Sequence, residues 1–140
     1  MGPVSAFRSL RWAVVVANLE PIIGHEQGGA RRALVVSYDS FHRSGSVTVC
    51  PMTAARSVTR YPNEVPIPVG EAGQTKAGVI LCHQVRTISM LRIVGAGQQP
   101  VGYVMDRDIR ARVRRALARH LGLDIPTTVD GASGGDVFGP

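Results

Sequence analysis

A polar, glycine-rich segment at residues 24–32 holds the densest group of side chains capable of chemistry. It contains a histidine, a glutamate, a glutamine and two arginines: His25, Glu26, Gln27, Arg31 and Arg32. Histidine and glutamate transfer protons, arginine binds phosphate through a planar fork, and glycine lets the backbone approach a ligand closely. This composition alone fits phosphate binding, acid–base work or an ordinary hairpin loop.

Polar residues also follow two apolar runs of the kind that form strands. Thr53 comes directly after the run that ends at residues 50–52, with Arg56 three positions later, and Gln84 and Arg86 follow a second run. Strand ends are where a small β-barrel places a site, but they are also where any barrel places its loops. On its own residues, a strand-end threonine is better interpreted as satisfying nearby backbone groups.

The charge balance favours a negatively charged partner. The chain has 16 Lys and Arg against 10 Asp and Glu, a formal net charge of +6, and Lys76 is its single lysine. Because arginine forks onto phosphate and carboxylate, such a surface suits nucleic acid or an acidic protein. A GC-rich genome, in which codon bias replaces Lys by Arg, explains the composition equally well.

The cysteines and the N-terminal residues favour a reducing compartment. Cys50 and Cys82 are too few for a disulfide scaffold and lack the paired spacing of a zinc site, so we predict two buried thiols and no metal. The apolar run at residues 12–17 is shorter than the core of a signal peptide, and Asn18 and Glu20 follow it directly. No stretch is long enough to span a membrane. We therefore predict a cytoplasmic protein.

Short β-branched runs bounded by Gly, Pro, Asp and Ser predict a mainly β chain. We expect strands at residues 13–19, 33–37, 46–52 and 77–82, an edge strand at 64–67, a short helical turn within 86–94 and a closing strand at 102–105.

One helix is predicted near the C-terminus. Asp106 is its expected N-cap, apolar residues follow at three- and four-residue spacing as far as Leu121, and Gly122 is its expected end. The other face of this helix carries six arginines, which we interpret as a solvated face rather than an RNA-binding stripe.

Short strands followed by one helix imply a small, strongly bent antiparallel sheet or barrel rather than a doubly wound fold. The expected organisation is a flexible leader at residues 1–11, one folded domain at 12–125 and a disordered Gly/Ser/Asp-rich tail at 126–140. No glycine pattern in the chain matches a nucleotide-binding fingerprint.

Short segments spread over most of the chain carry a family resemblance. They read NLEP at residues 18–21, GHEQGG at 24–29, RRALVVS at 31–37, PMT at 51–53, YPNEV at 61–65, QVRT at 84–87 and HLGL at 120–123. Any single segment is a weak signal. Together, in this order and with this spacing over about residues 11–125, they resemble the MazF/PemK toxins of type II toxin–antitoxin systems.

The resemblance implies a mainly β fold, a small SH3-like antiparallel barrel of the CcdB/MazF type with a C-terminal α-helix, working as a homodimer. Such toxins cut single-stranded RNA, often mRNA, at short sequences. They leave a 2′,3′-cyclic phosphate and a 5′-hydroxyl, with no metal or other cofactor. A cognate acidic, MazE-like antitoxin inhibits them by laying a disordered segment across the RNA groove. The positive charge of the chain suits both partners.

The resemblance also implies the site residues. Arg31 and Thr53 match the catalytic pair of the family, and Glu26 is a third catalytic candidate. The ribose 2′-hydroxyl attacks the adjacent phosphorus, so the protein must remove one proton, donate another to the 5′-oxygen and neutralise a phosphorane. Arg31 suits the charge and the donated proton, Thr53 can orient the phosphate, and the base stays open between Glu26, His25 and Arg31. The candidate substrate-binding residues are His25, Gln27, Arg32, Arg56, Gln84 and Arg86.

Several positions depart from the pattern of the family. Trp12 stands where the family commonly has Gly, and Val16 stands where it has an aromatic residue. Arg32 replaces the usual Pro, Asn63 a common Phe and His83 a common Asp. Trp12 suggests an altered N-terminal turn. None of these departures removes Arg31 or Thr53.

Three other functions remain as alternatives. One is a non-enzymatic, CcdB-like toxin that binds DNA gyrase through its terminal helix, and the intact Arg31–Thr53 pair argues against it. Another is a degraded homologue that binds antitoxin and RNA without cutting. The third, a plain RNA-binding barrel, needs exposed aromatic residues for base stacking, and only 5% of the chain is aromatic.

Overall fold

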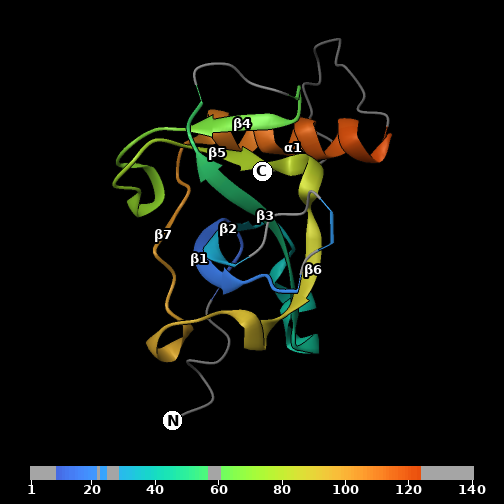
Figure 1. Cartoon of the computed structure of the whole chain (residues 1–140). Helices are drawn as coiled ribbons and strands as arrows, with labels where there is room; N and C mark the ends of the chain where they lie inside the picture. Colours follow the sequence, from blue (N-terminus) through green and yellow to red (C-terminus); the bar gives the residue numbers. More distant parts are fainter. Residues whose placement is uncertain (1–8, 22, 25–28, 57–60, 124–140) are drawn as a thin grey trace.

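The computed structural model describes residues 9–21, 23–24, 29–56 and 61–123 (Figure 1). Three of the predicted site residues, His25, Glu26 and Gln27, lie outside the described residues. So do the expected tail at 126–140 and all of the expected leader except residues 9–11.

The described part of the chain forms one curled antiparallel sheet of seven strands. They are β1 (Ala13–Asn18), β2 (Ala30–Val35), β3 (Ser46–Ala54), β4 (Glu64–Ile67), β5 (Gly78–Leu81), β6 (Arg86–Ser89) and β7 (Gly102–Tyr103). The order is β4-β5-β3-β2-β1-β7, and β6 pairs with β3 off this path. β3 is central because its first part pairs with β6, its middle with β2 and its end with β5. In Figure 1 it runs from β1 and β2 up to β4 and β5.

The two faces of β1, β2 and β3 are both covered, so alternate side chains enter two separate hydrophobic clusters. Val14 and Leu34 belong to the cluster that also contains the buried face of the helix. Val15 and Val35 belong to the second cluster, on the other face of the sheet. Burial on both faces explains why these strands read as continuous apolar runs rather than as alternating patterns.

The helix α1 (Arg107–Leu121) begins and ends where the sequence predicts. The N-cap Asp106 accepts a hydrogen bond at its Oδ1 from the backbone N–H of Ile109 at 3.0 Å, and Gly122 ends the helix with a left-handed φ of 69°. Its buried residues are Ile109, Val113, Ala116 and Ala118. Among the described residues, no helix combines the length and the apolar character that crossing a membrane requires.

The predicted fold class is confirmed, with a mainly β, antiparallel half-barrel and one C-terminal helix. Residues 64–67 form the expected edge strand, β4, and a 3-10 turn at Met90–Arg92 lies within the predicted segment 86–94. The two cysteines are buried and free, as expected.

The predicted bounds of the second and third strands were wrong. β2 begins at Ala30 rather than Ala33, because its pairing with β1 continues through Arg31 to Ala30. Arg31 and Arg32 therefore belong to a strand and not to the loop. β3 continues to Ala54 because its last residues find a new partner in β5. Cross-strand pairing, which local sequence does not reveal, sets both limits.

Candidate active site

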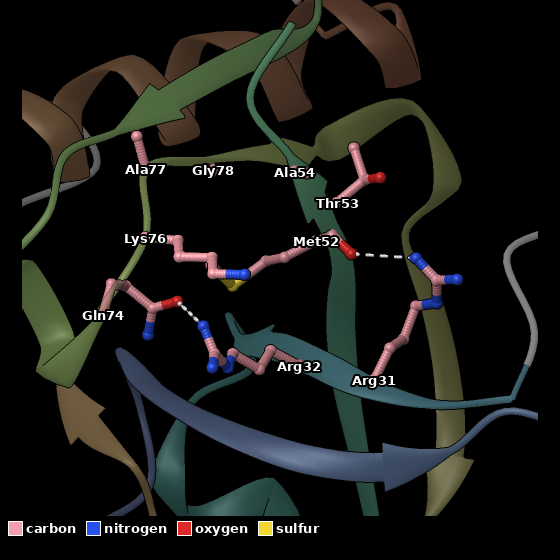
Figure 2. Close-up of a pocket in the computed structure, with 9 residues that line it drawn as sticks. All are labelled: Arg31, Arg32, Met52, Thr53, Ala54, Gln74, Lys76, Ala77 and Gly78. Atoms are coloured by element: carbon pink, nitrogen blue, oxygen red, sulfur yellow. Dashed lines mark hydrogen bonds between the residues drawn. The ribbon is translucent and has the colours of Figure 1, made fainter.

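A cavity opens where β2 and β3 separate. The two strands pair as far as Ala33 and Pro51, but from Met52 onward β3 pairs with β5 while β2 continues along β1. The cavity has a volume of about 320 Å³ (Figure 2). Nine residues line it: Arg31, Arg32, Met52, Thr53, Ala54, Gln74, Lys76, Ala77 and Gly78.

The predicted catalytic pair, Arg31 and Thr53, lines this cavity. Both side chains are half-buried, and Figure 2 shows them on the same side of β3. The Nη1 of Arg31 donates a hydrogen bond to the backbone oxygen of Met52 at 3.2 Å. Pairing with β1 fixes the backbone of Arg31, and pairing with β5 fixes that of Thr53. The sheet thus brings together two residues that are 22 positions apart in the sequence.

Three further polar residues line the other side of the cavity. Figure 2 shows Arg32, Gln74 and Lys76 across β3 from Arg31 and Thr53, as strand alternation requires for the neighbours Arg31 and Arg32. The Nη1 of Arg32 donates to the Oε1 of Gln74 at 2.8 Å. Sequence reasoning found Arg32 but missed Gln74 and Lys76, whose only signal is two polar residues shortly before a buried strand.

The charged residues that line the cavity are all positive. Arg31, Arg32 and Lys76 are cationic, and none of the nine described lining residues is acidic. Guanidinium groups held at a fixed position bind the nonbridging oxygens of phosphate, and the Thr53 hydroxyl can both donate and accept a hydrogen bond. The arrangement therefore suits a phosphodiester and can stabilise the negative charge that builds up when such a bond is attacked.

A model of the PemK-like, MazF-like toxins of type II toxin-antitoxin systems matches residues 10–121. The match covers most of the chain and includes every residue that lines the cavity. The chain belongs to this family.

Two endoribonucleases and one solved complex illustrate the likeness to MazF. Endoribonuclease EndoA of Bacillus subtilis is 37% identical over 84 residues, which are 59% of this chain and 72% of EndoA. Endoribonuclease MazF of Staphylococcus saprophyticus is 30% identical over 114 residues, which are 81% of this chain and 91% of that protein. The crystal structure of MazE-MazF (Form-II) from Deinococcus radiodurans matches with a TM-score of 0.61 at 30% identity, over 81% of this chain and 95% of the matched chain.

Three other predicted binding residues of this MazF-like chain are not among those that line the cavity. Arg56 lies with its Nη2 2.5 Å from the Oε2 of Glu64, a carboxylate with a fully buried side chain. Arg86, on β6, donates from its Nη1 to the backbone oxygen of Leu19 at 3.4 Å. Gln84 is half-buried in the 3-10 turn Cys82–Gln84. The described contacts of Arg56 and Arg86 connect separate segments of the fold.

Trp12, one of the departures from the family pattern, forms an unusual turn. Its φ is 71°, in the left-handed region, and its side chain is only 5% exposed. The backbone N–H of Trp12 donates to the oxygen of Val35 at 2.9 Å, and its oxygen accepts from the N–H of Val104 at 2.8 Å. The guanidinium groups of Arg110 and Arg114 lie 5.2 and 5.3 Å from the centre of the ring. The end of β2, the residue after β7 and a cation–π cluster thus hold a strained residue in place.

Two more departures lie together at the other end of the helix. His83 packs its ring against Tyr61, with ring centres 4.6 Å apart. Partial burial lowers the pKa of His83, and the nearby Glu64 carboxylate opposes that shift. Asn63 is nearly buried and accepts a hydrogen bond at its Oδ1 from the Nη1 of Arg119 at 3.2 Å. These residues dock α1 against β4 and do not line the cavity.

Proposed function

We propose that this chain is the toxin of a type II toxin–antitoxin pair and that it cuts single-stranded RNA, including mRNA, at short sequences without a metal. The observation that carries the proposal is the convergence of Arg31 and Thr53 on one cationic cavity. The activity named for its relatives EndoA and MazF supports the same function. Those relatives give no support to a gyrase-binding toxin.

In the proposed reaction the ribose 2′-oxygen attacks the neighbouring phosphorus, and the bond from phosphorus to the 5′-oxygen breaks. The products are a 2′,3′-cyclic phosphate and a 5′-hydroxyl. Arg31 donates hydrogen bonds to the nonbridging oxygens and neutralises the extra charge of the transition state. The hydroxyl of Thr53 holds the same phosphate in position. One proton leaves the 2′-hydroxyl for a base, and another reaches the 5′-oxygen.

The base is one of Glu26, His25 and Arg31, and its identity can be measured. A carboxylate or an imidazole base produces an acidic limb in the pH dependence of kcat/KM, which disappears when that residue is replaced. The variants Glu26→Gln and His25→Gln therefore separate the first two. A pH dependence of the natural protein without such a limb would leave the role to Arg31.

The same proposal includes the partners and the place of action. A complex of MazE with MazF in Deinococcus radiodurans supports a cognate MazE-like antitoxin, and the net charge of +6 suits an acidic one. We propose that the toxin works as a homodimer in the cytoplasm, where mRNA is available.

The decisive experiment is RNA cleavage by the purified protein in EDTA. We expect cleavage with 5′-hydroxyl ends, and losses of about 10²- to 10³-fold in kcat for Arg31→Ala, the size seen when one charge-stabilising donor is removed. Thr53→Ala should lose activity without losing stability in urea. Arg112→Gln, an exposed residue of α1, is the matched control and should cleave normally. Full activity in both site variants would contradict the assignment, and inhibition of DNA gyrase without any RNA cleavage would favour the CcdB-like alternative.

A further inference from the structure

The cavity holds its cations in two sets, one on each side of β3. Arg31 is fixed on one side by its hydrogen bond to the Met52 oxygen. Arg32 is fixed on the other side by Gln74, and Lys76 lies on that same side (Figure 2). Because neighbouring residues of a strand point to opposite faces, the two guanidinium groups diverge. Each guanidinium group thus faces its own part of the cavity and has its own hydrogen-bond partner.

Gln74 holds Arg32 with a side chain that has no freedom to turn. It is 3% exposed, and its Nε2 donates to the backbone oxygen of Ala72 at 2.9 Å. Since that end of the amide is occupied by an acceptor, the Oε1 must face the Nη1 of Arg32. A buried glutamine with both ends of its amide paired makes a rigid support for the guanidinium.

The turn that carries Gln74 is itself tightly held. A Cβ on Gly73 would lie 2.6 Å from the backbone oxygen of Val101, so the turn sits directly against the segment before β7. The Oε2 of Glu71 accepts hydrogen bonds from the backbone N–H groups of Met105 at 2.6 Å and Asp106 at 3.0 Å, which ties the turn to the start of α1. The position of Arg32 is thus fixed by the fold and not by a flexible loop.

Lys76 completes this side of the cavity. It is exposed, it lines the same cavity as Arg32, and it forms no ion pair with a carboxylate in the described part of the chain. Since no described lining residue is acidic, these two cations make this side of the cavity attractive to an anion. Glutamine, which is neutral, orients Arg32 without cancelling its charge.

We propose that Arg32 and Lys76 form a second phosphate subsite, which holds the phosphodiester next to the scissile one, and that Gln74 is its positioning residue. The proposal rests on the RNA-cleaving function proposed above and extends it. RNA enters the wedge between β2 and β3 with one phosphate at Arg31 and Thr53 and its neighbour at the second subsite. The contact fixes the register of the strand and adds affinity that does not depend on sequence.

Binding of an RNA oligonucleotide with 2′-O-methyl groups tests the subsite separately from cleavage, because this probe lacks the attacking hydroxyl. Each phosphate contact contributes a slope of about −0.7 to the plot of log affinity against log salt for single strands. Lys76→Gln and Arg32→Gln should each make the slope shallower, and the double variant should make it shallower by about 0.7, because both cations neutralise the same phosphate. This corresponds to about fivefold weaker binding at 0.1 M salt. Arg112→Gln removes the same charge from the exposed face of α1 and should change neither.

The role of Gln74 is tested by a double-variant cycle. If Gln74 only positions Arg32, then Gln74→Met weakens binding in the natural background but has little further effect in Arg32→Gln. Equal effects of Gln74→Met in both backgrounds would refute the positioning role. Urea unfolding of each variant identifies any loss that comes from the fold.

A neutral methylphosphonate linkage identifies which phosphate is bound. Placed next to the cleavage site, it should weaken binding about fivefold in the natural protein, less in Lys76→Gln, and not at all in the double variant Arg32→Gln/Lys76→Gln, which has lost both cations of the subsite. Unchanged salt slopes in both Arg32→Gln and Lys76→Gln would overturn the subsite, even if the natural protein cleaves RNA. Failure of the natural protein to cleave unmodified RNA would instead overturn the proposed function, and the salt slopes would still report on the subsite.

Discussion

Replacing Arg56 by methionine tests whether this residue stabilises the fold or binds RNA. Its guanidinium lies 2.5 Å from the Glu64 carboxylate, which has no exposed surface, while the Arg56 side chain is 27% exposed. Methionine keeps much of the aliphatic volume of Arg56 and removes only its charge and hydrogen bonds. Glu64 would then be a buried carboxylate that has lost its ion pair with Arg56.

The expected loss of stability follows from that burial. Removing one partner of a buried ion pair costs about 3–5 kcal/mol, because the other charge stays desolvated. Water can reach the partly exposed Arg56 position, so we expect about 3 kcal/mol, at the lower end of that range. Glu64→Leu should cost less, since the remaining arginine can reach solvent. The double variant should be more stable than Arg56→Met alone, because no buried charge is left.

Urea unfolding measures these differences through Trp12, the single tryptophan, which is 5% exposed in the folded chain. Binding of 2′-O-methyl RNA is measured on the same variants where they are fully folded, with Arg112→Met as the exposed control. We expect unchanged binding by folded Arg56→Met. A stability within about 0.5 kcal/mol of the natural protein, combined with weakened RNA binding, would refute the structural role and support direct RNA contact.

Three further predictions concern the packing around the site. Gly73→Ala should destabilise the chain by about 1–3 kcal/mol in urea, because its φ is 72° and the new Cβ would press on the oxygen of Val101; a neutral effect would show that the turn can shift. A hydrogen bond with Cys82 and burial raise the pKa of the Cys50 thiol, and Cys82 is buried as well, so both cysteines should react with a thiol reagent at pH 8 only as fast as the chain unfolds. Burial lowers the pKa of His83 in the folded chain, so the unfolded chain takes up the proton more readily. The free energy of unfolding should therefore fall as the pH drops below about 6.5. His83→Gln should flatten that decline between pH 7.5 and 5.5, and an unchanged slope would contradict the prediction.

Arg31 and Thr53 could be selected as the candidate catalytic pair from the sequence because their signal is local. Arg31 and Thr53 stand in short segments that resemble one family at the right spacing, and the structure places both at one cavity. Of the three polar residues on the other side of the cavity, only Arg32 was predicted, because it is next to Arg31 in the chain. Gln74 and Lys76 come from a distant turn, and nothing near them in the sequence indicates which strand they face.

The helices and strands that carry the site also differ in whether local sequence or distant contacts determine them. Residues close in the sequence determined the helix, because Asp106 and Gly122 cap it through contacts within one turn. They also determined the mainly β class. Only the tertiary structure decided that Arg31 lies in a strand and that the end of β3 leaves β2 for β5.

These tertiary features depend on pairing between strands that are far apart in the chain, and a single sequence carries no direct record of such pairing. The wedge between β2 and β3, and therefore the cavity itself, exists because one strand exchanges partners half-way along its length. Sequence alone thus predicted catalytic roles for Arg31 and Thr53. The fold decided which other residues share their cavity and on which side each of them lies.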